Sequence, residues 1–264
     1  EPVSAENLVN NRNSRNFWCN VKGIGSWSLT GHSAEELSKK FTEMQDDSEV
    51  TAGFMWQKTT RESKKYQLRG EILSFIPVDK NVEIMLVTIT NTGRMAQTVT
   101  PTAAIPLYGR SADNIRDHRH VTSLLHRIET TDTGVLVTPT LSFDERGHQV
   151  NHMTYYCVGW SGNGEKPVDF YPTAEDFVGE GGNFERPYAI VKNAEGVKAG
   201  TKIEGLEAVG GLHFSEITLE PEEECSYLIF TGITEDIQEI RNLSKTYTTR
   251  EKVLEELEKT KAYW

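Results

Sequence analysis

The sequence predicts a mainly β fold, built as one large antiparallel sandwich of two sheets and followed by a helical segment. Between Phe17 and Gly232 the chain consists of short apolar or alternating runs separated by turn residues. Hardly any helical pattern lies between these runs, which favours antiparallel pairing over parallel strands with crossover helices. Beyond Gly232 the pattern becomes helical and strongly charged. We therefore expect a β domain over residues 1–233 and a helical linker over residues 234–264.

The first half of the chain contains the clearest strand patterns. After an irregular start over residues 1–15, a strand is expected at Phe17–Val21. Ser33 and Glu36 form a capping box that begins a short helix, whose apolar stripe would be Leu37, Phe41 and Met44. Further strands are expected at Ala52–Gln57, Gln67–Ile76, Val82–Thr90 and Ala96–Thr102.

The second half adds more strands and one long connection. Strands are expected at His118–Glu129, Val135–Phe143 and Asn151–Trp160, and in a last hairpin formed by Leu212–Leu219 and Cys225–Thr231. The segment Thr130–Gly134 predicts a hairpin turn between the first two. Gly162–Arg186 is rich in glycine, proline and acidic residues, which predicts a long loop. Long loops in compact domains commonly carry function.

The C-terminal segment predicts two amphipathic helices. Glu235–Tyr247 places Ile237, Ile240 and Leu243 on one face. A second capping box at residues 248–251 begins a helix with Val253, Leu254 and Leu257 turned inward. A helical segment of this length has little to pack against within itself, so the sequence predicts a connector to a further domain.

Composition narrows the possible partners. The formal net charge is −11 over 264 residues, which disfavours nucleic acid and anionic membranes as partners. No apolar run approaches the roughly 20 residues of a membrane-spanning helix. The three cysteines are far apart and lack zinc-site spacing, so we expect free thiols in a reducing cytoplasm and no metal.

Several stretches resemble a known family. Residues 66–77 and 82–91 are similar to the strand, proline-containing turn and second strand of the N-terminal supersandwich domain of glycoside hydrolase family 94. Residues 210–213 are similar to a late glycine-rich turn and strand of that domain, residues 219–223 to its L-x-P-G-E turn, and residues 230–232 to its last strand. The family includes cellobiose, cellodextrin and chitobiose phosphorylases and cyclic β-1,2-glucan synthases. The resemblance implies a supersandwich of the galactose-mutarotase type.

The resemblance also implies a two-part enzyme. In the family, a downstream (α/α)6 barrel carries the general-acid aspartate, and inorganic phosphate attacks the anomeric carbon with inversion. The segment 116–127 resembles most the branch that acts on β-1,2-linked glucans, the 1,2-β-oligoglucan phosphorylases. We expect this chain to be a non-catalytic domain of such a protein, with a β-glucan oligosaccharide as ligand, phosphate as co-substrate, no other cofactor, and a homodimer as the assembly.

The same resemblance marks candidate ligand-binding residues. Family members carry a loop with the pattern D-R-x-x-F-[IL]-G, which reaches the acceptor side of an active site, commonly that of the other protomer. Thr173–Gly179 matches its second half, although Thr173 and Ala174 replace the acid and the arginine. Glu175 and Asp176 could accept hydrogen bonds from sugar hydroxyls. Phe177 would be either an apolar platform for the sugar or a plug in the core.

A second candidate is the most basic stretch of this acidic chain, formed by Arg116, His118, Arg119 and His120. If His118–Ile128 is one strand, its period of two puts His118, His120 and His126 on one face. Lining a passage for phosphate, binding a partner domain, holding a metal, or pairing with nearby carboxylates would each suit these residue types.

Two rival functions stay open from the sequence. A stand-alone carbohydrate-binding module would bind glucan by itself and would have its helical tail folded back onto the sheet. An aldose-epimerase-like enzyme would need a histidine and a carboxylate that converge in a concave sheet, for which His120 and Glu71 are the candidates.

Overall fold

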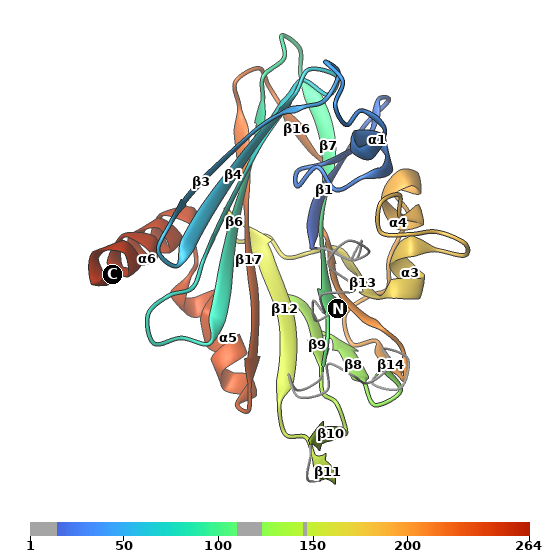
Figure 1. Cartoon of the computed structure of the whole chain (residues 1–264), viewed down its shortest axis with the longest axis vertical. Helices are drawn as coiled ribbons and strands as arrows, with labels where there is room; N and C mark the ends of the chain where they lie inside the picture. Colours follow the sequence, from blue (N-terminus) through green and yellow to red (C-terminus); the bar gives the residue numbers. More distant parts are fainter. Residues whose placement is uncertain (1–14, 110–122, 145–146) are drawn as a thin grey trace.

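The computed structural model describes residues 15–109, 123–144 and 147–264, and it shows two antiparallel sheets packed face to face (Figure 1). Every strand pair among these residues is antiparallel. The mainly β, antiparallel fold predicted from the sequence is therefore confirmed.

The larger sheet has nine strands in the order β14-β8-β9-β12-β17-β6-β5-β4-β3. Its members, in chain order, are β3 (Asp47–Gly53), β4 (Trp56–Ser63), β5 (Leu68–Phe75), β6 (Val82–Asn91), β8 (Arg127–Thr130), β9 (Gly134–Val137), β12 (Thr154–Ser161), β14 (Lys202–Glu204) and β17 (Glu224–Thr234).

The smaller sheet has six strands in the order β13-β15-β7-β1-β2, with β16 also paired to β7. Its members are β1 (Asn16–Val21), β2 (Gly25–Ser28), β7 (Gln97–Leu107), β13 (Asp169–Thr173), β15 (Ala208–His213) and β16 (Ile217–Leu219). A separate hairpin consists of β10 (Leu141–Asp144) and β11 (Gly147–Val150).

The main core lies between the two sheets. Alternate residues of facing strands fill it, as the period of two along a strand requires. Phe17 on β1 and Tyr227 on β17 meet there with ring centroids 5.5 Å apart. Cys19 and Cys157 are buried in this core and Cys225 is partly buried, all three as free thiols, as expected.

Two helices, α5 (Ile237–Thr246) and α6 (Arg250–Tyr263), cover the outer face of the nine-stranded sheet (Figure 1). Their buried side chains pack against alternate residues of β5, β6, β12 and β17. These side chains are Ile240, Leu243, Tyr247, Val253 and Leu257. The tail predicted as a connector is thus folded onto its own domain.

The short helices α3 (Ala174–Val178) and α4 (Tyr188–Lys192) cover the outer face of the six-stranded sheet. A third core of smaller size lies beneath them and contains Trp18, Tyr171, Phe177 and Ile190. A further short helix, α1 (Ala34–Ser38), is joined to this region by a hydrogen bond from Ala34 N to Glu185 O of 2.9 Å.

Strands β1, β5, β6, β7, β12 and β17 lie where the sequence predicts them, and so do the hairpin turn at Thr130–Gly134 and both C-terminal helices. The inward position predicted for Leu254 is wrong, because Leu254 is 36% exposed, and Ile237 on the predicted apolar face of α5 is 41% exposed. The N-cap of α6 is Thr249, and its side chain makes no capping bond.

The predicted strand Ala52–Gln57 is wrong, because a tight turn at Phe54 and Met55 divides it between β3 and β4. Met55 adopts a φ of 63°, which ends an extended segment. A Cβ on Gly53 would lie 2.2 Å from Trp56 Nε1, so the turn requires glycine at this position.

The helix that Ser33 begins is shorter than predicted. The Ser33 hydroxyl caps Glu36 N as expected, but α1 ends at Ser38. Leu37, Phe41 and Met44 are 41%, 91% and 70% exposed, so no apolar stripe forms. The buried residue of α1 is Glu36, whose carboxylate lies near Lys39 and Arg61.

Four other segments differ from prediction. The expected loop Gly162–Arg186 contains the buried strand β13 and the short helix α3. In the expected strand His118–Glu129 the described residues form a turn and then β8, while residues 118–122 lie outside the described part. Pro139 separates β9 from β10, because it cannot continue a central ladder. Strands β16 and β17 belong to different sheets and form no hairpin.

No helix in the described part of the chain is long and apolar enough to span a membrane.

Candidate functional site

The segment that resembles the family's acceptor-side loop is held firmly in the fold. Thr173 ends β13 and is the N-cap of α3, with its hydroxyl accepting a hydrogen bond of 3.1 Å from Asp176 N. The same hydroxyl donates to Asp176 Oδ2 at 2.7 Å. The polar end of α3 is therefore fixed by Thr173, a residue that stands where the family pattern has its acid.

The structure brings the two acidic candidates together on one exposed surface. Glu175 and Asp176 are consecutive residues in the first turn of α3, and both are exposed. Ionised carboxylates accept hydrogen bonds from hydroxyl groups, so this turn has the chemistry that a sugar ligand requires.

The third candidate points the other way. Phe177 is fully buried, and its ring lies 6.0 Å from that of Tyr171 and 5.7 Å from that of Phe184. It presents no face to solvent, so it cannot be a sugar platform in this arrangement. Of the two roles considered, it has that of a plug, and it ties α3 to the six-stranded sheet.

The basic candidates Arg116, His118, Arg119 and His120 lie outside the described residues. The neighbouring His126 is described and is only 4% exposed. Its Nδ1 lies 3.0 Å from Leu206 O, which anchors the turn before β8 to the chain leading into β15. The described residues 123–126 form a turn, so the strand expected over 118–128 does not continue through His126.

The proposed epimerase pair is not supported by its carboxylate. Glu71 lies on the same face of β5 as Leu73 and Phe75, and these two residues pack beneath α5 and α6. Glu71 therefore lies on the outer face of the nine-stranded sheet, where Lys58 Nζ is 3.7 Å away. The concave inner face lacks the carboxylate that this hypothesis placed there.

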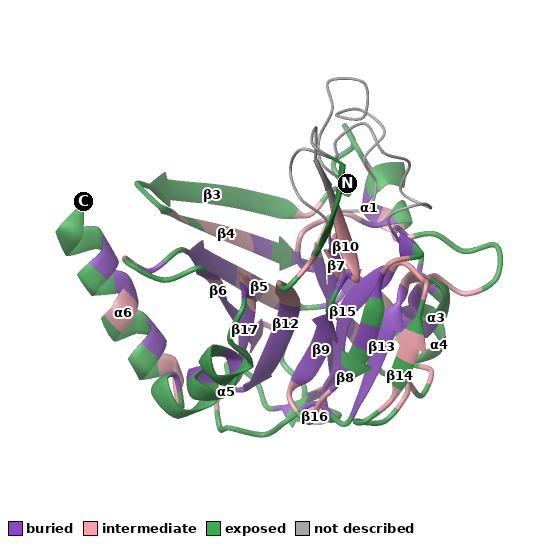
Figure 2. Cartoon of the chain, turned by 90° about the horizontal axis from the view of Figure 1, so that it is seen from below, coloured by how far each residue is buried: buried purple, intermediate pink, exposed green. Residues whose placement is uncertain are grey.

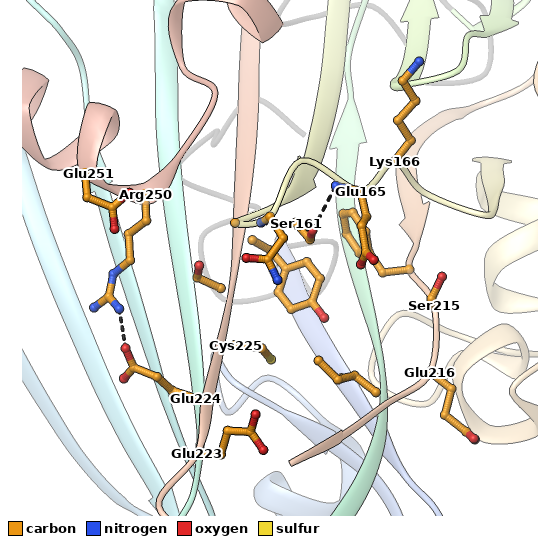
Figure 3. Close-up of a pocket in the computed structure, with 16 residues that line it drawn as sticks. Ser161, Glu165, Lys166, Ser215, Glu216, Glu223, Glu224, Cys225, Arg250 and Glu251 are labelled. Carbon is orange, nitrogen blue, oxygen red and sulfur yellow. Dashed lines mark hydrogen bonds and ion pairs between the residues drawn. The ribbon is translucent and has the colours of Figure 1, made fainter. Parts of the chain in front are cut away.

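A cleft that sequence reasoning missed lies where the two sheets part (Figure 3). It has a volume of about 430 Å³ and lies between the ends of β12, β15 and β17 and the start of α6. Its lining includes the rings of Phe214 and Tyr227, whose centroids are 4.6 Å apart. Five glutamates and two basic residues, Lys166 and Arg250, also line it.

The rim of this cleft is already ordered by internal contacts. Arg250 forms an ion pair with Glu224, which fastens the start of α6 to the start of β17 (Figure 3). The Ser161 hydroxyl accepts a hydrogen bond of 3.0 Å from Glu165 N. The sequence signal for this site is the segment 220–224, in which four of five residues are glutamates, but this pattern predicts only a turn.

The two buried titratable groups of the cleft, Cys225 and Tyr227, are held in their neutral forms. Burial raises the pKa of the Cys225 thiol to about 12, so the nucleophilic thiolate does not form near neutral pH. Burial also raises the pKa of the Tyr227 hydroxyl. Within the described ranges, no group of three or more His, Cys, Asp or Glu side chains is arranged to hold a metal ion.

A buried histidine–carboxylate pair lies in the six-stranded sheet. His213 Nδ1 lies 2.6 Å from Asp169 Oδ1, and the Tyr171 hydroxyl is 3.4 Å from the same nitrogen. All three residues are at least 93% buried. The pair joins β13 to β15 and stabilises the sheet edge beneath α3.

Comparison with known proteins identifies the domain. The family profile described as "Glycosyl hydrolase 94, supersandwich domain" matches residues 20–250. No curated protein matches the chain in sequence.

Solved structures with similar folds are distant in sequence. A polysaccharide lyase is 11% identical with a TM-score of 0.40, over 86% of this chain and 26% of the lyase. A bacterial glucoamylase in complex with acarbose is 10% identical with a TM-score of 0.46, over 92% of this chain and 30% of the glucoamylase. A TPR-domain containing protein from Parabacteroides distasonis is 10% identical with a TM-score of 0.31, over 73% and 35%.

The chain therefore spans between 26% and 35% of the length of these structures. The profile match, in contrast, extends from β1 through the first residue of α6 and includes both sheets of the sandwich. This chain belongs to the glycosyl hydrolase 94 supersandwich domain family.

Proposed function

We propose that this chain is the non-catalytic N-terminal domain of an inverting β-glucan phosphorylase. The observation that carries the proposal is the profile match over residues 20–250. In this proposal the β domain, residues 1–233, shapes the acceptor side of an active site. Residues 234–264 lead to a downstream (α/α)6 catalytic domain.

The proposed ligand is a β-glucan oligosaccharide, with a 1,2-β-oligoglucan as the first choice. Glu175 and Asp176 would accept hydrogen bonds from hydroxyls of the acceptor sugar, because both are exposed and Asp176 is held by the Thr173 hydroxyl. Inorganic phosphate would be the co-substrate of the whole protein. We further propose that the protein is a cytoplasmic homodimer.

The test uses the protein encoded by the complete reading frame. Phosphate and β-1,2-glucooligosaccharides should yield glucose 1-phosphate with inverted, α configuration. In the synthetic direction, Asp176→Asn should raise the KM for the acceptor several-fold and leave the KM for glucose 1-phosphate unchanged. Asparagine keeps an oxygen for the Thr173 hydroxyl, so α3 retains its cap.

Glu180→Gln is the matched control, because Glu180 is exposed just beyond α3. Unchanged acceptor kinetics in Glu175→Gln and Asp176→Asn would overturn the site assignment. Absence of phosphorolysis with every β-glucan tested would overturn the function itself.

A second candidate is favoured by one observation. Helices α5 and α6 fold back onto the nine-stranded sheet, as expected for a stand-alone carbohydrate-binding module. Titration calorimetry of the 264-residue chain with β-glucan oligosaccharides distinguishes the two. Millimolar affinity in the isolated chain supports the module, whereas no binding favours a site that needs a second domain.

A further inference from the structure

Strand β3 forms one edge of the nine-stranded sheet and lies bare to solvent. It is the last strand in the sheet order, and all seven of its residues are exposed. In Figure 2, β3 lies at the border of the sheet and is exposed along its whole length. Val50, at its centre, is 64% exposed. Both faces and the outer edge of this strand are therefore available to a partner.

The other sheet edges in the described structure are short or covered. Strand β14 has three residues, and its Lys202 pairs with Glu129 of the neighbouring strand. Strand β2 has four residues, and the Ser26 hydroxyl bonds to Ile190 O of α4. Strand β13 is bridged through Phe170 to Val197. Strand β3 is unlike all of these.

Strand β3 lacks most of the devices that prevent edge pairing. Natural edges carry charged side chains, above all lysine, or proline or a bulge, and of these β3 has only the carboxylates of Asp47 and Glu49. The sequence Asp47–Gly53 contains no proline and no lysine, and it pairs with β4 without a bulge from Asp47↔Glu62 to Gly53↔Trp56. A regular strand of this length is a template for a further strand.

The turn determines which backbone groups of β3 point outward. A two-residue turn closes on a hydrogen-bonded pair, here Gly53 and Trp56, and bonded pairs then alternate along the ladder. The peptide groups of Thr51 and Glu49 therefore face β4. Those of Ser48, Val50 and Ala52 face away from the sheet and are free to pair.

We propose that β3 pairs antiparallel with β3 of a second copy of this chain, with Val50 on the two-fold axis. This register places Ser48 opposite the partner's Ala52 and Val50 opposite the partner's Val50. All of these residues have outward peptide groups, so the new ladder is hydrogen-bonded at both ends and at its centre.

Charge selects this register over its neighbours. With the axis at Val50, Glu49 faces the partner's Thr51 and Asp47 faces the partner's Gly53, so no like charges are opposite. An axis at Glu49 would place two carboxylates face to face. An axis at Thr51 would bring the Phe54–Met55 turn against Ser48 and shorten the ladder.

The side chains complete the match on both faces. The partner's Glu49 arrives beside Thr51 on the outer face, and Thr51 is paired with Lys58 of β4. Lys58 is thus two strands from the partner's Glu49 and on the same face, within reach of a long side chain. On the inner face the two Val50 side chains contact each other and lose their exposure to water.

This pairing gives a specific form to the homodimer of the proposed function, on which it rests. The interface is isologous and uses the same edge in both copies, so the assembly closes at two. The remaining edges are short or covered, which prevents further growth. Because β3 is remote in sequence from the acidic turn of α3, its test does not depend on sugar chemistry.

The test is charge complementation at the two-fold axis in the 264-residue chain. Sedimentation velocity over a range of concentrations should give a dimer for the unmodified chain. Val50→Glu and Val50→Lys should each be monomeric, because each places two like charges opposite one another. An equimolar mixture of Val50→Glu and Val50→Lys should restore the dimer as a heterodimer.

Met95→Glu and Met95→Lys are the matched controls, since Met95 is 73% exposed in a turn outside β3. Both should dimerise like the unmodified chain, and circular dichroism should show that all four variants are folded. A monomeric unmodified chain overturns the proposal. So does a dimer that both Val50 variants leave intact, or two monomeric Val50 variants that stay monomeric when mixed.

Discussion

The two sheets of this sandwich are covered on their outer faces in different ways. Over the nine-stranded sheet, α5 and α6 are long helices, and the α5–α6 segment buries Ile240, Leu243, Tyr247, Val253 and Leu257 in one continuous cluster. Over the six-stranded sheet, α3 and α4 have five residues each, and α3 has a single buried residue, Phe177. Helices α5 and α6 are therefore attached through many side chains, whereas α3 is attached through the single ring of Phe177.

This difference teaches how stability is distributed in the domain. A helix of five residues has almost no stability of its own, because helix nucleation is unfavourable and few backbone bonds follow it. Its position must then come from its cap and its anchor. The α3 turn, which carries Glu175 and Asp176, is therefore the part of the proposed site most easily detached.

The largest effect should come from removing the single anchor. Phe177→Ala should lower the free energy of unfolding by about 3–5 kcal/mol, because a fully buried ring leaves a cavity. Denaturant unfolding measures the loss. Hydrogen exchange should show α3 opening locally, while Leu257→Ala, one of several anchors of α6, should leave most of α6 protected. Equal exchange in α3 and α6 of the two variants would remove the contrast between the covers.

A smaller loss of stability is expected from breaking a hydrogen bond that holds the α5–α6 segment to the nine-stranded sheet. Trp160 Nε1 donates to Tyr247 O at 3.0 Å, and both rings stack on Phe230. Trp160→Phe should cost about 1–3 kcal/mol, because the buried carbonyl loses its partner. Trp56→Phe, at a partly exposed site of β4, is the control and should change stability by about 0.5 kcal/mol or less. Equal losses in both would show that the Trp160 bond is not special.

The caps offer a closer test of the same contrast. Thr173→Ala and Asp236→Ala each remove a side chain that caps a helix, α3 and α5 respectively. Each should cost about 1 kcal/mol in denaturant unfolding. Only Thr173→Ala should also increase hydrogen exchange through its whole helix, and Thr173→Ser, which keeps the hydroxyl, should restore protection. Protection of α3 in Thr173→Ala would mean that Phe177 alone is sufficient.

The contrast also explains what the sequence could predict. Helices α5 and α6 are long enough for their apolar period to appear, and strands β6 and β17 contain continuous apolar runs. Five residues are too few to show a helical period, so α3 was hidden in a segment that its glycines and acids marked as a loop. For its anchor Phe177, the sequence left two roles open, an apolar platform for a sugar and a plug in the core.

Pairing between distant strands was the other limit. Alternation in Leu212–Leu219 and Cys225–Thr231 correctly predicted strands, but it contains no information on which sheet each strand joins. The choice is made by long-range contacts such as the Asn91 amide, which donates to Leu219 O at 2.9 Å where the chain crosses between sheets. The cleft between the sheets follows from this crossing, so it could not be predicted either.

Helix α1 provides a third kind of attachment, in which charge replaces apolar burial. The Glu35 carboxylate accepts hydrogen bonds from Lys39 at 2.7 Å, from Lys65 at 2.8 Å and from the Tyr66 hydroxyl at 2.7 Å. Partial burial alone would raise its pKa, but these donors outweigh burial and lower the pKa from 4.5 to about 2. Because the folded pKa is depressed, Glu35 stabilises the fold above about pH 4.5, and this contribution is lost as the pH falls toward 2.

The smallest expected effect is a change in how steeply stability declines as the pH falls. Glu35→Gln should lower stability near neutral pH and flatten the decline between pH 4.5 and 2, as measured by denaturant midpoints across that range. The effect is modest because the Glu35 side chain is 31% exposed and solvent screens its partners. Glu43→Gln removes one exposed carboxylate outside β3 and is the control for net charge. If Glu35→Gln declined as steeply as the unmodified chain, α1 would be attached by its Ser33 cap and the Glu36 contacts, and the polar anchor would have to be placed there instead.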